Sequence, residues 1–183
     1  ARYALAVCLW KLRQPAEAAK ELDAVLPVKG FEFAADARLL RARCAESAGD
    51  DRAAVAALAT LAADHPAFDK LDQATLALAE AKYRLGDFRA CRDALAADAW
   101  PRSPSRPRML LFLAMAESAL GETSKAADHA ASALAAAPAG ELAPNAALLD
   151  AQGRRRLGET ARAEAGFEQA ARLAKDALRA EAL

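Results

Sequence analysis

The sequence predicts an all-α protein built from repeated helix-turn-helix units, and its composition and two regularities support this. Apolar residues make up 55% of the 183 residues, whereas aromatic residues make up only 5%. A chain this rich in alanine and leucine suits close-packed helices rather than sheets. The first regularity is a turn that recurs with separations of 36, 37, 35 and 37 residues by subtraction, at Arg13, Gly49, Gly86, Gly121 and Gly158.

The second regularity is an alanine seven residues before every turn. Two helices approach closely only where a side chain is small, so a repeated alanine indicates a repeated packing contact. The five positions are Ala6, Ala42, Ala79, Ala114 and Ala151.

Ten helices are predicted in five pairs, one before and one after each turn. The predicted ranges are 2–12 and 15–26, 34–48 and 51–64, 71–85 and 88–97, 108–120 and 123–136, and 144–157 and 161–180. Pro15 stands at a favoured first-turn position, segment 27–31 is the first connection, and His65-Pro66 ends the fourth helix. In the fourth pair, Gly121 permits the turn, Thr123 or Ser124 can cap the next helix, and Pro138 stops it.

The largest break lies between Trp100 and Pro107, where three prolines and two serines occur. Proline cannot continue a helix, so this segment separates the third pair from the fourth. Two interpretations remain open. The segment at 100–107 is either a hinge between a three-repeat and a two-repeat block, or a long loop with Trp100 packed on neighbouring helices, and we favour the loop.

The repeated positions resemble the tetratricopeptide repeat family, whose period is about 34 residues. Leu5-Ala6, Leu78-Ala79 and Leu113-Ala114 look like the first-helix part of its motif. Its small second-helix residue matches Ala18, Ala54, Cys91, Ala126 and Ala163. The resemblance implies one right-handed α-α superhelix, a solenoid, over 1–183, with repeats at about 1–34, 35–71, 72–106, 107–143 and 144–180. The last helix does not look like a polar cap, so we expect the natural chain to continue past Leu183.

Charge and hydropathy exclude some classes of partner. Basic and acidic residues both number 25, so electrostatic binding to nucleic acid or to an anionic membrane is not expected. Membrane insertion is not expected either, because no window approaches the unbroken apolar run of about 18 residues that a membrane span needs.

Three widely spaced cysteines, Cys8, Cys44 and Cys91, support neither a disulfide framework nor a metal site. We expect all three to be small buried side chains. Buried single thiols are compatible with the cytoplasm and the periplasm, and we favour the cytoplasm. The richness in alanine and arginine suggests a bacterial source.

Catalytic groups are scarce, and no cofactor or metal is expected. The sequence contains two histidines, His65 and His129, and neither belongs to a recognisable catalytic set. No glycine-rich phosphate loop, nucleophile elbow or paired-cysteine pattern is present. The run Arg154-Arg155-Arg156 is interpreted as a solvated helix end, since three adjacent residues point in different directions. The sequence therefore predicts a protein that is not an enzyme.

The resemblance implies that the first helix of each repeat lines an inner, concave face that binds extended or helical peptides. The predicted peptide-binding positions are selected from the residues ten, six and three before the turns, together with Arg84, because Tyr, Trp and Arg carry much of the energy of an interface. They are Tyr3, Val7, Trp10, Leu39, Arg43, Leu76, Glu80, Tyr83, Arg84, Leu111, Met115, Leu148, Gln152 and Arg155. An alternative is that the leucines only seal the contacts between repeats. Family members that hold chaperone tails use Lys and Asn here, and these positions do not match that set.

The sequence as a whole predicts a non-catalytic scaffold or adaptor that binds a protein or peptide partner. The alternative interpretation is a self-assembly or regulatory arm of a larger enzyme or transcription regulator, which leaves a homo-oligomer open.

Overall fold

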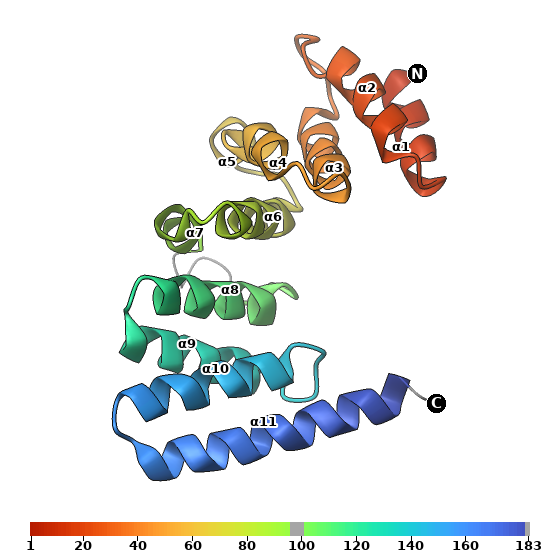
Figure 1. The fold of residues 1–183 in the computed structure, drawn as a ribbon. Helices are drawn as coiled ribbons and strands as arrows, with labels where there is room; N and C mark the ends of the chain where they lie inside the picture. Colours follow the sequence, from red (N-terminus) through yellow and green to blue (C-terminus); the bar gives the residue numbers. More distant parts are fainter. Residues whose placement is uncertain (96–100, 182–183) are drawn as a thin grey trace. The chain divides into compact units, whose positions relative to one another are not determined.

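The computed structural model describes residues 1–95 and 101–181, and Figure 1 shows its helices in sequence order. These residues form eleven helices and no strand, so the predicted all-α fold is confirmed. They divide into two compact units, Ala1–Asp87 and Phe88–Leu183. This division falls between the two helices of the third predicted repeat. Segment 100–107, interpreted as either a hinge or a long loop, lies partly outside the described residues, so both interpretations stay open and the repeat boundaries stay a prediction.

The first unit contains six helices. They are α1 (Arg2–Lys11), α2 (Pro15–Val25), α3 (Ala34–Ser47), α4 (Asp51–Leu58), α5 (Leu61–Asp64) and α6 (Leu71–Arg84). Within this unit α2 packs against both α1 and α3, and α4 packs against both α3 and α6. The first helices α1, α3 and α6 contact one another much less.

The second unit contains five helices in the same alternation. They are α7 (Phe88–Ala94), α8 (Arg106–Ala119), α9 (Thr123–Ala136), α10 (Ala143–Arg156) and α11 (Thr160–Glu181). Here α9 packs between α8 and α10, and α11 packs along α10. None of the described helices is both long and apolar enough to cross a membrane.

The predicted turns share one geometry. At Gly49, Gly86, Gly121 and Gly158 the φ angle lies between 71° and 80°, in the left-handed region that glycine tolerates best. In each turn the glycine N–H bonds to the carbonyl three residues back, and the next N–H bonds to the carbonyl five residues back. This pair of bonds satisfies carbonyls at the end of the helix. Arg13 adopts the same conformation, with φ at 61°.

The predicted alanine contacts are confirmed, because all five alanines that precede the turns are 0% exposed. The small residues that follow the turns are buried as well. The closest approaches involve glycine: a Cβ added at Gly153 would lie 2.8 Å from the Cβ of Ala127, and one at Gly166 would lie 2.9 Å from the Cβ of Ala151. Small side chains therefore set the spacing of α9, α10 and α11.

Three local predictions are wrong. The helix predicted over 51–64 is broken into α4 and α5 at Thr60, whose hydroxyl donates to Asp64. Such side-chain bonding competes with helix continuation. Neither Thr123 nor Ser124 caps α9, because the helix begins at Thr123 itself and Glu122 precedes it without a side-chain cap bond. Finally, α8 begins at Arg106 and takes Pro107 into its first turn, where a missing N–H costs nothing. Trp100 lies outside the described residues.

The cysteine prediction is correct for two residues and wrong for one. Cys44 and Cys91 are buried, whereas Cys8 is exposed. Cys44 belongs to a cluster with Ala18, Leu22 and Leu40, so α2 of the preceding pair covers it. Cys8 holds the equivalent place on α1, where no described helix supplies that cover.

Candidate functional site

The predicted binding residues lie on the first helices, and the structure distinguishes buried members from accessible ones. Leu39, Leu111 and Glu80 are buried. Leu39 packs in a cluster with Leu58 on α4, and Leu111 packs in another with Ala133 on α9. These two leucines pack against the second helix of their own pair and present almost no surface to a partner.

The other predicted residues keep accessible surface. Arg43, Arg84, Leu148 and Arg155 are exposed, with Leu148 at 41%. The half-buried positions are Tyr3, Val7, Trp10, Leu76, Tyr83, Met115 and Gln152. The accessible set is therefore a mixture of charged, aromatic and aliphatic side chains.

In the first unit, Tyr3 from the predicted set belongs to an aromatic cluster. The rings of Tyr3 and Phe33 stack with centroids 5.4 Å apart, and Phe31 meets both rings edge-on. Phe33 remains 45% exposed. The sequence analysis missed both phenylalanines: Phe31 was assigned to the connection at 27–31, and Phe33 lies between this connection and the helix predicted from residue 34. Their closeness in sequence, in a chain with few aromatics, is the signal that could have revealed them.

Three polar contacts join α3 to α6 along their length. Lys70 Nζ lies 2.6 Å from Asp36 Oδ1, Arg43 donates to Gln73 Oε1 at 2.8 Å, and Arg84 reaches Glu46 at 3.4 Å. Arg84 also bonds Asp51 on α4 at 2.7 Å. Arg43 and Arg84 thus have intramolecular contacts that sequence reasoning did not predict.

The charged side chains of Asp36 and Lys70 affect the pKa of Tyr3. Burial and the nearby Asp36 carboxylate raise the pKa of the Tyr3 hydroxyl, and Lys70 opposes them. The hydrogen bond from Lys70 to Asp36 raises the pKa of the Lys70 ammonium. The aromatic cluster therefore lies next to the Asp36–Lys70 ion pair.

In the second unit, Arg154 and Arg155 of the arginine run make contacts in different directions, as their spacing predicted. Arg154, however, is not solvated. The Arg154 side chain is 15% exposed and lies 2.8 Å from Asp128, 3.0 Å from Asp150 and 3.7 Å from Glu159. Arg155 instead lies over the ring of Phe167, 5.4 Å from its centroid. Arg154 consequently joins α9 to α10 and is a structural residue.

The two histidines occupy different settings. His129 Nδ1 lies 2.7 Å from Oε2 of the buried Glu117, a contact that links α9 to α8. His65 follows α5, where its backbone N–H bonds to the Leu61 carbonyl. Over residues 1–95 and 101–181, no group of three or more His, Cys, Asp or Glu side chains is placed to hold a metal ion.

Comparison with known proteins identifies the fold. No protein-family model and no curated protein matches the chain. Among solved structures, MamA is similar with a TM-score of 0.79 and 16% identity, over 95% of this chain and 96% of that one. A MamA fragment from Desulfovibrio magneticus RS-1 is similar with a TM-score of 0.79 and 13% identity, over 96% and 94%. The kinesin light chain TPR-like repeats of Podosopora anserina are similar with a TM-score of 0.71 and 18% identity, over 97% of this chain and 95% of that one. The chain therefore has the tetratricopeptide-like repeat fold.

Proposed function

We propose that this protein is an interaction scaffold that binds a peptide segment of a partner on the accessible face of its first helices. The observation that carries the proposal is a surface in the first unit that we call the first-helix strip. It consists of Tyr3, Phe33, Asp36, Arg43, Lys70 and Gln73. These residues come from α1, α3, α6 and the residues immediately preceding α3 and α6.

The strip is continuous. The stack of Tyr3 on Phe33 joins α1 to the start of α3, and the Asp36–Lys70 pair joins α3 to the start of α6. The Arg43–Gln73 bond continues the same seam. An exposed ring thus lies at one end and charged groups follow it, a combination that can anchor an apolar side chain and pair with a charged one.

The chemistry of the strip suits peptide recognition. Arg43 is exposed and makes one hydrogen bond to a neutral amide, so its guanidinium has donors left for a partner. The Asp36–Lys70 pair is partly exposed, and an ion pair of this kind contributes little to stability. A ligand can therefore replace these contacts at small cost to the fold.

The test is selection of peptides from a displayed random library, followed by fluorescence anisotropy with the selected peptides. Tyr3→Ala and Arg43→Ala should each weaken binding about tenfold or more, because residues of these types dominate peptide interfaces. Arg52→Ala, on the exposed part of α4, is the matched control for Arg43→Ala and should leave affinity unchanged. Selected peptides that bind all variants equally, or the absence of any enriched peptide, would contradict the proposal.

A second candidate function, self-association, is favoured by one observation. Leu5 and Cys8 on α1 and Leu12 directly after it follow helical spacing, and the two leucines are 49% and 69% exposed. Light scattering under reducing conditions tests this candidate. A dimer of the unmodified protein that dissociates on the double change Leu5→Gln and Leu12→Gln would support it, and a monomer at every concentration would refute it.

A further inference from the structure

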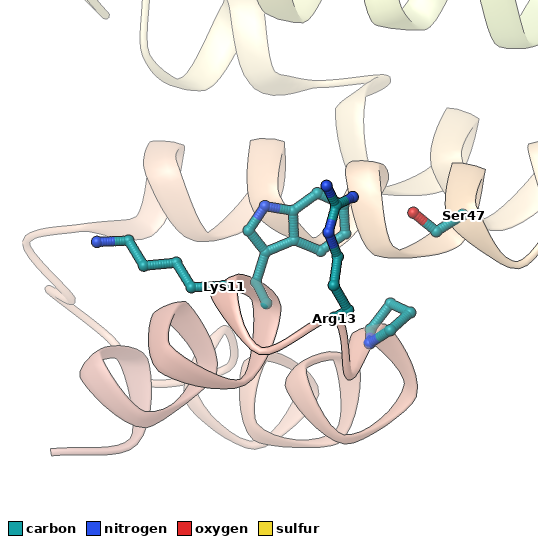
Figure 2. A pocket seen from close by; sticks show the side chains of 5 residues that line it. Lys11, Arg13 and Ser47 are labelled. Carbon is teal, nitrogen blue, oxygen red and sulfur yellow. The ribbon is translucent and has the colours of Figure 1, made fainter.

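A pocket of about 460 Å³ opens at the turn between α1 and α2. Its lining comes from three consecutive helices of the first unit: Trp10 and Lys11 on α1, Arg13 in the turn, Pro15 on α2 and Ser47 at the end of α3. Figure 2 shows the Arg13 side chain rising from the turn, Ser47 on the neighbouring helix, and Lys11 extending away from both. Its volume lies within the range of about 300–1,000 Å³ that is usual for ligand sites.

The backbone holds Arg13 at a fixed place in this pocket. Its N–H bonds to the Trp10 carbonyl at 3.0 Å, and the next N–H, of Gln14, bonds to the Leu9 carbonyl at 2.9 Å. These bonds close the turn in the same way as at the four glycine turns. Arg13 is the one residue other than glycine with a positive φ in the described part of the chain. A residue other than glycine that is kept in a strained backbone conformation suggests a functional role for its side chain.

The pocket carries positive charge without acidic compensation. No carboxylate lines it, and neither Lys11 nor Arg13 has an ion-pair partner among the described residues. Glu46 precedes Ser47 in sequence but reaches toward Arg84. Other arginines of the first unit, such as Arg38 and Arg84, do have carboxylate partners within it. The pocket thus has unused hydrogen-bond donors beside an indole ring and a proline.

We infer that this pocket binds the side-chain carboxylate of a Glu or Asp in an acidic segment of a partner protein. The planar guanidinium of Arg13 matches the two oxygens of a carboxylate, and the Ser47 hydroxyl supplies a further donor. Trp10 and Pro15 offer apolar walls for the methylene groups that carry the carboxylate. Lys11 extends away from Arg13, so it adds a longer-range attraction rather than a direct bond. The inference needs neither Tyr3 nor Arg43 and does not depend on the first-helix strip.

The test uses acetyl-Ala-Leu-Glu-Leu-Ala amide and the same peptide with Gln in place of Glu, so that the pair differs only in the charged group. Binding is followed by the NMR shift of the Trp10 indole N–H, which is assigned with Trp10→Phe. The Glu peptide should shift this resonance saturably, and the Gln peptide should bind at least about tenfold more weakly. Equal shifts from both peptides would overturn the inference.

Arg13→Gly separates binding from folding. Glycine relieves the strained turn, so this variant should stay folded and melt no lower than the unmodified protein, yet lose at least about tenfold in affinity for the Glu peptide. Lys11→Ala should have a smaller effect. Lys20→Ala, an exposed cation on α2 outside the pocket, is the charge-matched control and should bind normally. Undiminished binding by Arg13→Gly, or tighter binding of inorganic phosphate than of the Glu peptide, would overturn the inference.

Discussion

The five turns share one backbone conformation, so a substitution at a single turn residue should change the free energy of unfolding measurably. A Cβ added at Gly121 would find nothing within 4 Å, so the site is open although its φ angle is 80°. Arg13 shows the opposite case, since it has a side chain and the same backbone conformation. The two positions separate backbone strain from side-chain packing.

Gly121→Ala should lower the free energy of unfolding by about 1–2 kcal/mol, the cost of placing an L-residue in the left-handed region. Arg13→Gly should raise it by at most about 1 kcal/mol, because the relief of strain is partly offset by the greater freedom of glycine in the unfolded chain. Guanidinium denaturation followed by circular dichroism measures both changes. Equal destabilisation by the two substitutions would show that conformation is not the cause.

Asp64, the last residue of the short helix α5, should make the stability of the protein depend on pH. Hydrogen bonds from Arg38 and Thr60 lower the pKa of its carboxyl from the ordinary value of an aspartate. A carboxyl with a depressed folded pKa contributes stability above its unfolded pKa, and the contribution disappears as the pH falls through the folded value. A carboxyl-detected NMR titration should therefore find the pKa of Asp64 lowered from the ordinary value of an aspartate, and Arg38→Ala should move this pKa upward. An unchanged pKa in the variant would rule out the Arg38 bond as the cause.

At the scale of elements, the distance between helices is set by the smallest side chains on their facing surfaces. Gly153 on α10 faces Ala127 on α9, where an added methyl group would come within 2.8 Å of another. A rigid Cβ cannot move aside, so α10 would have to shift away from α9.

Gly153→Ala should therefore destabilise the protein by about 1–2 kcal/mol, although alanine is the better helix former by about 1 kcal/mol. The double variant with Ala127→Gly restores the space and should recover most of the lost packing. Thermal denaturation compares the three proteins. If the double variant is less stable than the sum of the two single changes predicts, the close contact is not the source of the effect.

Helices and turns could largely be predicted from sequence, and α9 agrees with the predicted 123–136 in both bounds. The glycine and alanine spacings are local signals that each repeat carries. The break at Thr60 was missed because it depends on Asp64 and on Arg38 of another helix. For the same reason, the burial of Leu39 and Leu111, the partners of Arg154 and the exposure of Cys8 depend on which other helices lie beside them, and the local spacing does not reveal these neighbours.

At the scale of the whole molecule, each of the two units has its own buried core. Leu22 is fully buried in a cluster of the first unit, and Leu111 is buried in a cluster of the second. In repeat proteins stability is roughly a sum over units and their nearest interfaces. A core cavity should therefore act mainly on the unit that contains it.

Leu22→Ala should cost about 2–5 kcal/mol and speed amide hydrogen exchange in α1, α2 and α3, with a smaller effect in α8, α9 and α10. Leu111→Ala should give the reverse pattern. Hydrogen exchange with mass spectrometry resolves the two units by peptide. Uniform acceleration over the whole chain in both variants would mean that the protein unfolds as a single cooperative body.

The uneven exposure of the three thiols makes the protein easy to label at one place. Burial raises the pKa of the Cys44 thiol, which leaves less of the reactive thiolate, and Cys91 is fully buried. Cys8 stands open on α1, three residues before Lys11. A maleimide dye or spin label would thus attach to α1 without any engineered cysteine, one helical turn from the pocket. The native chain already carries its own reporter for a ligand that occupies this site.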